Sequence, residues 1–262
     1  MIVSPRPLAA PAWLCALALG LAWPHPGRCQ SESGPIGGNL AVTSDYIYRG
    51  VSQSDGQGAV QADLHASTRG GTFGGIWASS RDDNLEPNTP AELQLYVGQR
   101  FSLGSAWSAT LSGRATYFVG ATPDHSVDYQ EVSAALTWLD RCTFSLTAIP
   151  NAVRYYFSQY DGYYHVYRSE ALVADGSSQW LLAEGVLGGG LFFTAAAGYY
   201  YTTRPDHHPP PAIGYLYGNA GLALERGPWR IDLGYYASQS RAAQVFPYPV
   251  ANRFAATVSW QF

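Results

Sequence analysis

The stretch RFAATVSWQF, residues 253–262, alternates between apolar and mostly polar side chains. Successive side chains of an extended strand point to opposite sides, so every second residue lies on the same face. The apolar face holds Phe254, Ala256, Val258, Trp260 and Phe262. The pattern predicts a β-strand with one apolar face and one mostly polar face.

The same alternation recurs along most of the chain. Clear examples are residues 60–67, 107–117 and 229–236. Short turns near positions 70, 104, 140, 189 and 227 alternate with longer polar loops near 53, 85, 123, 163, 207 and 245. This alternation is typical of barrels that cross a membrane, and it predicts about twelve strands. We therefore expect an all-β fold, a closed antiparallel transmembrane β-barrel.

The sequence also predicts the first strand, a long loop and the positions of aromatic belts. We predict the first strand over residues 40–50. Residues 151–177 are rich in Tyr and contain two Asp-Gly pairs, so we predict a long loop there with a hairpin inside it. Aromatic belts are expected where the strands end on the apolar face. Tyr48 shares the apolar face of the first strand with Tyr46. The predicted belt residues are Phe73, Trp107, Trp138, Trp229 and Trp260 near the turns and Tyr46, Trp77, Tyr117 and Tyr235 near the loops.

The composition agrees with a barrel in a membrane. The chain of 262 residues is 47% hydrophobic and 13% charged, whereas an average soluble domain has about 25% charged residues. After the first thirty residues, no apolar run reaches the length of a membrane helix. A soluble β-sandwich is the alternative, but it would bury its apolar faces in a core between two sheets.

The first 29 residues have the organisation of a secretory signal peptide. Arg6 supplies the positive charge, residues 12–23 form a short apolar core, and Gly27 and Cys29 stand at the expected cleavage site. We expect residues 1–29 to be removed from the mature protein.

The remaining residues, 30–262, are expected to form one outer-membrane barrel domain. Cys29 would also suit a lipoprotein, but residues 26–28 (Pro-Gly-Arg) do not match the usual motif. Cys142 is the one cysteine beyond the leader, so we expect no disulfide framework. Once Arg6 and Arg28 are removed, 13 Arg face 19 acidic residues, a net charge of −6. This charge argues against nucleic acid as a partner.

Three blocks of sequence resemble a known family. DYIYRGVSQS (residues 45–54), GIWAS (residues 75–79) and ELQLYVG (residues 92–98) are similar to the TorF-type porin family of proteobacterial outer membranes. The chain departs from the usual family pattern at Tyr48, where Phe is common, and at Gln94, where Asp is common. The closing strand, which ends in Phe, also resembles that of outer-membrane barrels as a class. The resemblance implies a barrel in the bacterial outer membrane.

The polar faces of the predicted strands carry charges of both signs. We predict that these side chains line the lumen of a narrow pore, where opposed charges set the preference for ions. The predicted pore-lining residues are Arg49, Asp63, His65, Glu92, Arg114, Glu131, Arg230, Asp232 and Arg253. Arg114 lies between Ser112 and Thr116, so its guanidinium is expected to project furthest into the path. The alternative is an interior of paired, packed side chains without conduction.

An enzyme is the second alternative, because some outer-membrane barrels act on lipid. Asp63, His65 and Ser67 share one strand face, but neighbours on that face lie ~6.6 Å apart along the strand, too far for a direct relay. The sequence has no G-x-S-x-G nucleophile motif. We therefore expect no catalytic residues and no cofactor. A structural or adhesive barrel is a further alternative.

Two loop features have both a functional and a purely structural interpretation. Asp206-His207-His208 would hold a metal with help from another loop, but adjacent histidines in a Pro-rich loop are usually solvated, and we predict no metal site. Aromatic residues crowd positions 155–167, where they would stack sugars, anchor a partner or pack on one another.

The expected partners follow from the barrel. They are outer-membrane lipid, small polar solutes, and a barrel-assembly machinery that receives the closing strand. Trp260 and Phe262 are the residues that we expect to matter for assembly.

Overall fold

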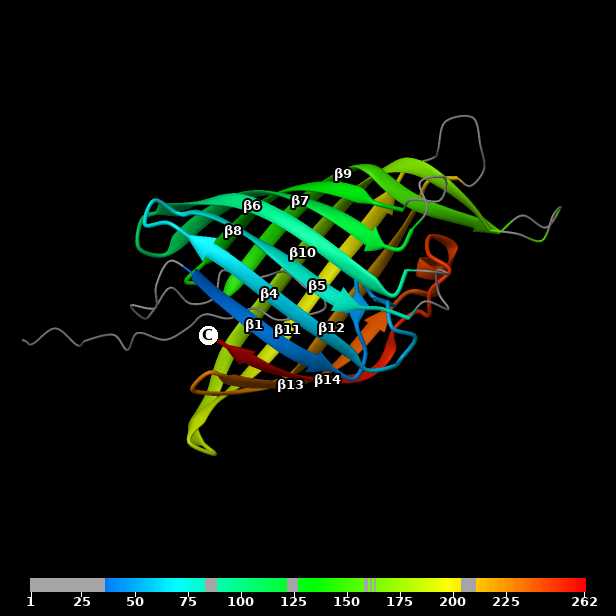
Figure 1. The fold of residues 1–262 in the computed structure, drawn as a ribbon. Coiled ribbons are helices and arrows are strands. Elements are labelled where there is room, and N and C mark those ends of the chain that lie inside the picture. Colours follow the sequence, from blue (N-terminus) through cyan, green and yellow to red (C-terminus); the bar gives the residue numbers. More distant parts are fainter. Residues whose placement is uncertain are drawn as a thin grey trace, which may run out of the picture.

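We describe a computed structural model, which covers residues 36–82, 89–121, 127–157, 160, 162, 164–203 and 211–262. Within these residues, twelve long strands close into one antiparallel barrel (Figure 1). The barrel strands are β1 (Ile36–Thr43), β4 (Ala59–Ser67), β5 (Thr72–Ser80), β6 (Ala91–Leu103), β7 (Trp107–Val119), β8 (Tyr129–Trp138), β9 (Cys142–Phe157), β10 (Tyr164–Val186), β11 (Gly189–Thr202), β12 (Ile213–Arg226), β13 (Trp229–Ser238) and β14 (Asn252–Gln261).

The first and last strands close the barrel. Each strand pairs with its neighbours in the chain, and β1 also pairs with β14, so that Leu40 lies opposite Trp260 and Val42 opposite Val258. The expected closed antiparallel barrel of about twelve strands is confirmed. Its closing strand alternates as predicted, with Trp260 outside and Ser259 buried inside.

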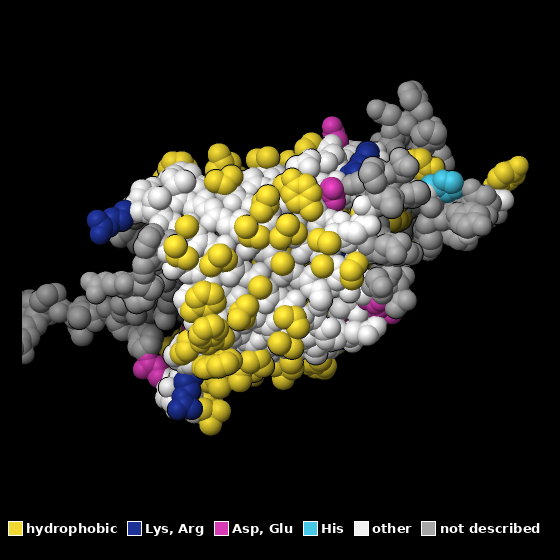
Figure 2. Space-filling view, in the orientation of Figure 1, with side chains coloured by type: hydrophobic (Ala, Val, Ile, Leu, Met, Phe, Trp, Pro, Cys, Tyr) yellow, Lys and Arg dark blue, Asp and Glu magenta, His cyan; other side chains and the backbone are white. Residues whose placement is uncertain are grey.

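The outer wall of the barrel is apolar. Leu64, Val97 and Leu111 are each more than half exposed on this wall. Figure 2 shows hydrophobic side chains spread over the strands, while the coloured charged side chains lie towards the two ends. Such a surface is stable against hydrocarbon and unfavourable in water.

The two ends of the barrel differ in their connections. Tight turns join β4 to β5, β6 to β7 and β8 to β9 at the end where β14 finishes, which we call the turn end. The opposite end, which we call the loop end, carries the connection between β1 and β4 and the short helix η2 (Ser240–Gln244), as Figure 1 shows. No helix in the part of the chain described here is long and apolar enough to cross a membrane.

The predicted first strand is wrong at its loop end. The strand ends at Thr43, and the following residues turn into the barrel as a hairpin of β2 (Ile47–Tyr48) and β3 (Val51–Ser52). Tyr46 and Tyr48, which we predicted on the outer face, are only 2% and 9% exposed. An apolar alternation is equally compatible with a hairpin packed inside a barrel, so the sequence pattern does not distinguish the two.

Phe73 and Trp77 also lie inside the barrel, contrary to the prediction. Both rings are buried in a cluster that includes Tyr46 and Tyr96. The outward position between them is taken by Ile76, which is about half exposed. Aromatic rings occupy inward positions here because the hairpin provides an apolar surface for them to pack against.

The long loop predicted over residues 151–177 is wrong as well, although the hairpin expected inside it is present as the antiparallel pairing of β9 with β10. Strand β9 continues to residue 157 and β10 begins at residue 164, so most of this segment extends two barrel strands. Asp175 and Gly176, which we took for a turn, lie within β10 opposite Ser145 and Phe144. Pairing on both sides overrides the local turn preference of Asp-Gly.

Some predictions fall on residues outside the described ranges. The signal peptide over residues 1–29 and the group Asp206-His207-His208 are among them. The division into a leader and a barrel domain over residues 30–262 therefore stays a prediction. Cys142 is a free thiol in the structure.

Candidate functional site: a hairpin folded into the barrel

The hairpin is closed by a two-residue turn at Arg49 and Gly50. Both residues have positive φ, +47° and +78°, as a type I′ turn requires. Glycine adopts this conformation freely, but for a residue with a side chain it costs about 1–2 kcal/mol. Arg49 is therefore held in an unfavourable backbone conformation by its contacts, a situation that is common at functional sites.

The tip of the hairpin is held by an ion pair with the barrel wall. Arg49 Nη1 lies 2.6 Å from Glu131 Oε1 on β8, and the Tyr215 hydroxyl donates to the Arg49 carbonyl oxygen at 3.0 Å. The Glu131 carboxylate also lies 3.5 Å from Arg114 Nη1 and accepts a hydrogen bond from the Tyr48 hydroxyl at 3.3 Å. One buried carboxylate thus joins the hairpin to two strands of the wall.

Tyr46 makes a second contact with the wall. Its hydroxyl donates to Glu92 Oε2 at 3.3 Å, and its ring centre lies 5.6 Å from that of Trp77. Burial raises the pKa of the Tyr46 phenol, and the pKa of the Tyr48 phenol is raised by burial too. Both hydroxyls therefore stay protonated and available as donors to the two buried carboxylates.

Asp45 organises the base of the hairpin. Its Oδ1 accepts hydrogen bonds from the hydroxyls of Ser52 at 2.5 Å and Ser54 at 3.0 Å. Arg253 Nη1 on β14 lies 3.6 Å from Asp45 Oδ2. The Ser54 hydroxyl also accepts a hydrogen bond from the Tyr46 backbone N–H at 2.9 Å. These local contacts close the hairpin at the end where it leaves the wall.

Gln53 connects the hairpin to the residues that follow β5. Arg81 Nη2 donates to Gln53 Oε1 at 3.0 Å, and the Asp82 backbone N–H donates to the Gln53 carbonyl oxygen at 3.1 Å. Arg81 Nε also lies 4.0 Å from Glu92 Oε2. The three sequence blocks with family resemblance therefore meet in space. Residues 45–54 form the hairpin, and Tyr46 contacts Trp77 in the second block and Glu92 in the third.

The segment before β14 covers the other side of the hairpin. Val51 forms an antiparallel bridge with Val250, flanked by hydrogen bonds of 2.9 Å from Ser52 N–H to the Pro249 carbonyl and from Ala251 N–H to the Gly50 carbonyl. The hairpin thus lies between the barrel wall and this second segment.

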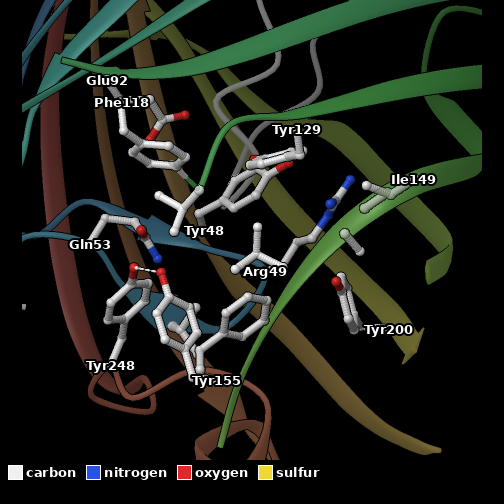
Figure 3. Close-up of a pocket in the computed structure, with 15 residues that line it drawn as sticks. Tyr48, Arg49, Gln53, Glu92, Phe118, Tyr129, Ile149, Tyr155, Tyr200 and Tyr248 are labelled. Carbon is white, nitrogen blue, oxygen red and sulfur yellow. Dashed lines mark hydrogen bonds between the residues drawn. The ribbon is translucent and has the colours of Figure 1, made fainter. Parts of the chain in front are cut away.

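A cavity lies beside the hairpin at the loop end. Its empty volume is about 550 Å³, including space open to solvent. Figure 3 shows aromatic rings around it, with the Tyr155 and Tyr248 hydroxyls 3.1 Å apart. The lining residues are Tyr48, Arg49, Val51, Gln53, Glu92, Phe118, Val127, Tyr129, Ile149, Ala152, Val153, Tyr155, Tyr200, Phe246 and Tyr248.

All nine predicted pore-lining residues lie in the barrel interior, although Arg49 reaches it from the hairpin and not from a strand. Arg49, Glu131 and Arg114 are brought together, and Glu92 lies on the other side of the hairpin. Whether these residues line a conducting path stays a prediction.

The expectation for Arg114 is wrong. Its side chain is only 6% exposed and lies against Glu131, so it does not project freely along the barrel. The strand register explains the difference, since Arg114 on β7 lies directly opposite Glu131 on β8 and the two side chains pair across the ladder.

A second charged group lies towards the turn end. Arg230 pairs with Asp232 at 2.7 Å and also with Glu225. Its Nη1 donates to Gln179 Oε1 at 3.2 Å. These residues cross-link strands around the interior, and one guanidinium faces two carboxylates.

Asp63 and His65 are closer than we expected. His65 Nδ1 lies 2.5 Å from Asp63 Oδ1, and the Tyr96 hydroxyl donates to Asp63 Oδ2 at 2.8 Å. The side chains lean towards each other, so the spacing along the strand did not prevent a direct contact. Tyr96 was not among the predicted site residues, and no motif in the sequence indicated its contact with Asp63.

Fold and interior together define a porin-like β-barrel with a hairpin folded into its lumen. The chain belongs to the Gcw_chp family, a family of bacterial proteins of unknown function, whose model matches residues 30–164. The match includes the hairpin and both blocks of sequence around it. It does not test the narrower resemblance to the TorF-type family, which stays a prediction.

The fold is similar to that of a solved porin, NanC. The NanC porin is 10% identical, with a TM-score of 0.52 over 86% of this chain and 97% of NanC. The KdgM porin is 7% identical, with a TM-score of 0.45 over 87% of this chain and 97% of KdgM. OprD from Pseudomonas aeruginosa is 14% identical, with a TM-score of 0.41 over 88% of this chain and 66% of OprD. No curated protein sequence matches the chain.

Proposed function

We propose that the protein is a pore of the bacterial outer membrane through which small polar solutes and ions pass passively. The observation that carries this proposal is the polar, charged barrel interior, narrowed at one end by a hairpin that ion pairs and hydrogen bonds hold in place. A polar interior within an apolar wall is the arrangement of water-filled barrels in a membrane.

The turn-end half of the barrel supports passage. Inward positions of β7 and β8 there carry small hydroxyl side chains, of which Ser112 is partly exposed while Ser108 and Ser133 are buried. Larger charged groups are paired, as Arg230 is with Asp232. A lumen that carries charges of both signs suits small uncharged solutes as well as ions, and the hairpin is the constriction that limits their size.

The location and assembly partners belong to the same proposal. The apolar wall would face outer-membrane lipid, with the loop end outside the cell and the turn end in the periplasm. The barrel-assembly machinery would receive β14, in which Trp260 and Phe262 remain the residues that we expect to matter. Backbone hydrogen bonds of 2.9 and 3.0 Å between Gly38 and Phe262 support a role for the last residue in sealing the barrel.

Single-channel recording tests the pore. The mature protein, refolded in detergent and added to planar bilayers, is expected to give small, discrete current steps. The same preparation heated until the barrel unfolds is the control. Current steps that are no more frequent than with the heated protein would refute the proposal.

A barrel without conduction is the second candidate, and one observation favours it. The inward side chains of Gln94, Thr116 and Thr147 are fully buried, which also fits a packed interior. A structural or adhesive role, or an enzyme acting on lipid, would then take the place of the pore. Absence of current together with phospholipid hydrolysis or binding to a partner surface would identify these alternatives.

A further inference from the structure

The cavity beside the hairpin has mainly apolar walls. Aromatic rings line it from the hairpin, from β11 and from the segment before β14, while Ile149 and Val153 close it from β9. Walls of this kind pack well against a flat ring, since aromatic pairs gain energy in stacked and tilted arrangements. The empty volume of about 550 Å³ includes space open to solvent, so the cavity can be entered from the loop end.

One side of this cavity offers unused hydrogen-bond donors. Arg49 lines the cavity, and Figure 3 shows it beside Ile149 and Tyr200. Its side chain is 2% exposed, and Nη1 is engaged with Glu131. Nε and Nη2 are buried and have no hydrogen-bond partner among the described residues. Buried donors without a partner are rare in proteins, and a ligand is one of the groups that satisfies them.

The two unused nitrogens have a definite geometry. Nε–H and Nη2–H point along the same edge of the planar guanidinium, which binds the two oxygens of a carboxylate or one carbonyl oxygen. Glu131 occupies the remaining nitrogen, so it does not compete for this edge. The edge therefore selects a ligand that carries an oxygen acceptor.

The charges around the cavity do not decide between an anion and a neutral acceptor. Arg49 and Arg114 share Glu131, and Arg81 lies beside Glu92. Asp175, which accepts a hydrogen bond from the Tyr217 hydroxyl, also interacts with Arg49. Three guanidinium groups are thus balanced by three carboxylates.

We propose that this cavity binds small aromatic molecules with a carboxylate or carbonyl group, the ring against the tyrosine-rich wall and the oxygen on the Nε–Nη2 edge of Arg49. The inference deepens the proposed function, on which it rests for the role of the ligand as a solute. Bound at the loop end beside the constriction, such a molecule is concentrated at the entrance to the lumen.

Binding is tested with four probes on the refolded full barrel in micelles, by isothermal titration calorimetry against empty micelles. Benzoate and benzamide carry both ring and acceptor, and their relative affinities distinguish an anionic from a neutral preference. Acetate lacks the ring, and protonated benzylamine lacks the acceptor. We expect heat of saturable binding from benzoate, benzamide or both, and none from acetate or benzylamine.

Two variants locate the site. Arg49→Lys keeps the charge beside Glu131 but removes the bidentate edge, so the affinity is expected to fall roughly ten- to hundredfold. Val153→Phe fills the cavity from the wall, leaves the hairpin sequence unchanged and is expected to abolish binding. Leu146→Phe, on the outer face of the same strand, is the matched control and should bind like the wild type.

Several results would overturn the inference. They are the absence of binding, benzylamine binding as well as benzoate, or benzoate affinity that Val153→Phe leaves unchanged. The pore is judged separately by its conductance. A barrel that conducts but binds no probe overturns this inference alone, whereas one that binds benzoate without conducting refutes the pore.

Discussion

The Arg49 guanidinium lies 2.6 Å from the Glu131 carboxylate, inside a barrel whose outer wall is apolar. The arginine is on a loop and the glutamate is on a wall strand, so the contact determines where the loop lies. Removing charge from water is costly, and a buried pair offsets this cost only while both partners are present. The hairpin is therefore stable inside the lumen as long as the pair is intact.

Replacing Glu131 by Gln is expected to destabilise the protein. The variant has nearly the same shape but leaves Arg49 and Arg114 buried without their shared countercharge. Breaking a buried ion pair in this way typically costs about 3–5 kcal/mol. The free energy of unfolding, measured in urea with the barrel in lipid vesicles and followed by tryptophan fluorescence, should fall by that amount.

Glu170→Gln is the matched control for this change. Its side chain is exposed at the loop end, and an exposed substitution of this kind changes stability by at most about 0.5 kcal/mol. Equal stability of the two variants would show that the ion pair does not hold the hairpin.

Gly50→Ala tests the position of the hairpin. A Cβ atom at Gly50 would lie 2.6 Å from the Cβ of Tyr217 and 2.6 Å from the hydroxyl oxygen of Ser238, and the φ of +78° adds strain. The clash acts only while the hairpin is inside the barrel, whereas the backbone strain belongs to the turn itself. We expect the variant to displace the hairpin and to show a larger single-channel conductance with the barrel still folded.

Gly104→Ala separates the clash from the backbone strain. This glycine has a similar φ of +83° in a tight turn, but a Cβ there meets nothing within 4 Å. The variant should lose only about 1–2 kcal/mol from the left-handed backbone and keep the wild-type conductance. If the two alanine variants conduct alike, the hairpin does not limit the current.

The strand pattern of most of the barrel could be predicted from the sequence, because half-buried strands obey a period of two. The inward position of Arg230 and the outward position of Ile231 follow from this rule. The rule fails for Tyr46 and Trp77, since it separates two faces without indicating which one meets lipid. Contact with an inserted hairpin makes an inward aromatic residue favourable.

The candidate site was predictable in its residues but not in its arrangement. Arg49 and Glu131 were both expected in the lumen, yet nothing in the sequence indicated that they touch. The contact depends on a turn with positive φ at Arg49, where glycine or asparagine is more usual. The tertiary ion pair overrides this local preference, so local sequence rules cannot reveal the hairpin.

Deleting Phe262 is expected to impair assembly. The residue extends the closing strand, and its backbone pairs with Gly38 beside the seam between β1 and β14. The folded, heat-modifiable band in outer-membrane fractions should become weaker. Leu187→Ala, at an exposed apolar residue of another turn, is the control and should leave the band unchanged. A band of normal strength without Phe262 would contradict a role for this residue.

A disulfide between positions 51 and 250 tests whether the hairpin moves during conduction. Val51 and Val250 face each other in an antiparallel bridge flanked by two backbone hydrogen bonds that neither residue makes, a pairing with Cα atoms about 4.5 Å apart. This distance suits a disulfide. In a Cys142→Ser background, Val51→Cys with Val250→Cys should form the bond with little strain.

If the hairpin swings aside to admit solutes, the oxidised barrel will show fewer openings, and a reducing agent will restore them. The Val51→Cys single variant should not respond to the reducing agent. Equal currents in the oxidised and reduced double variant would mean that solutes pass the hairpin while it stays in place.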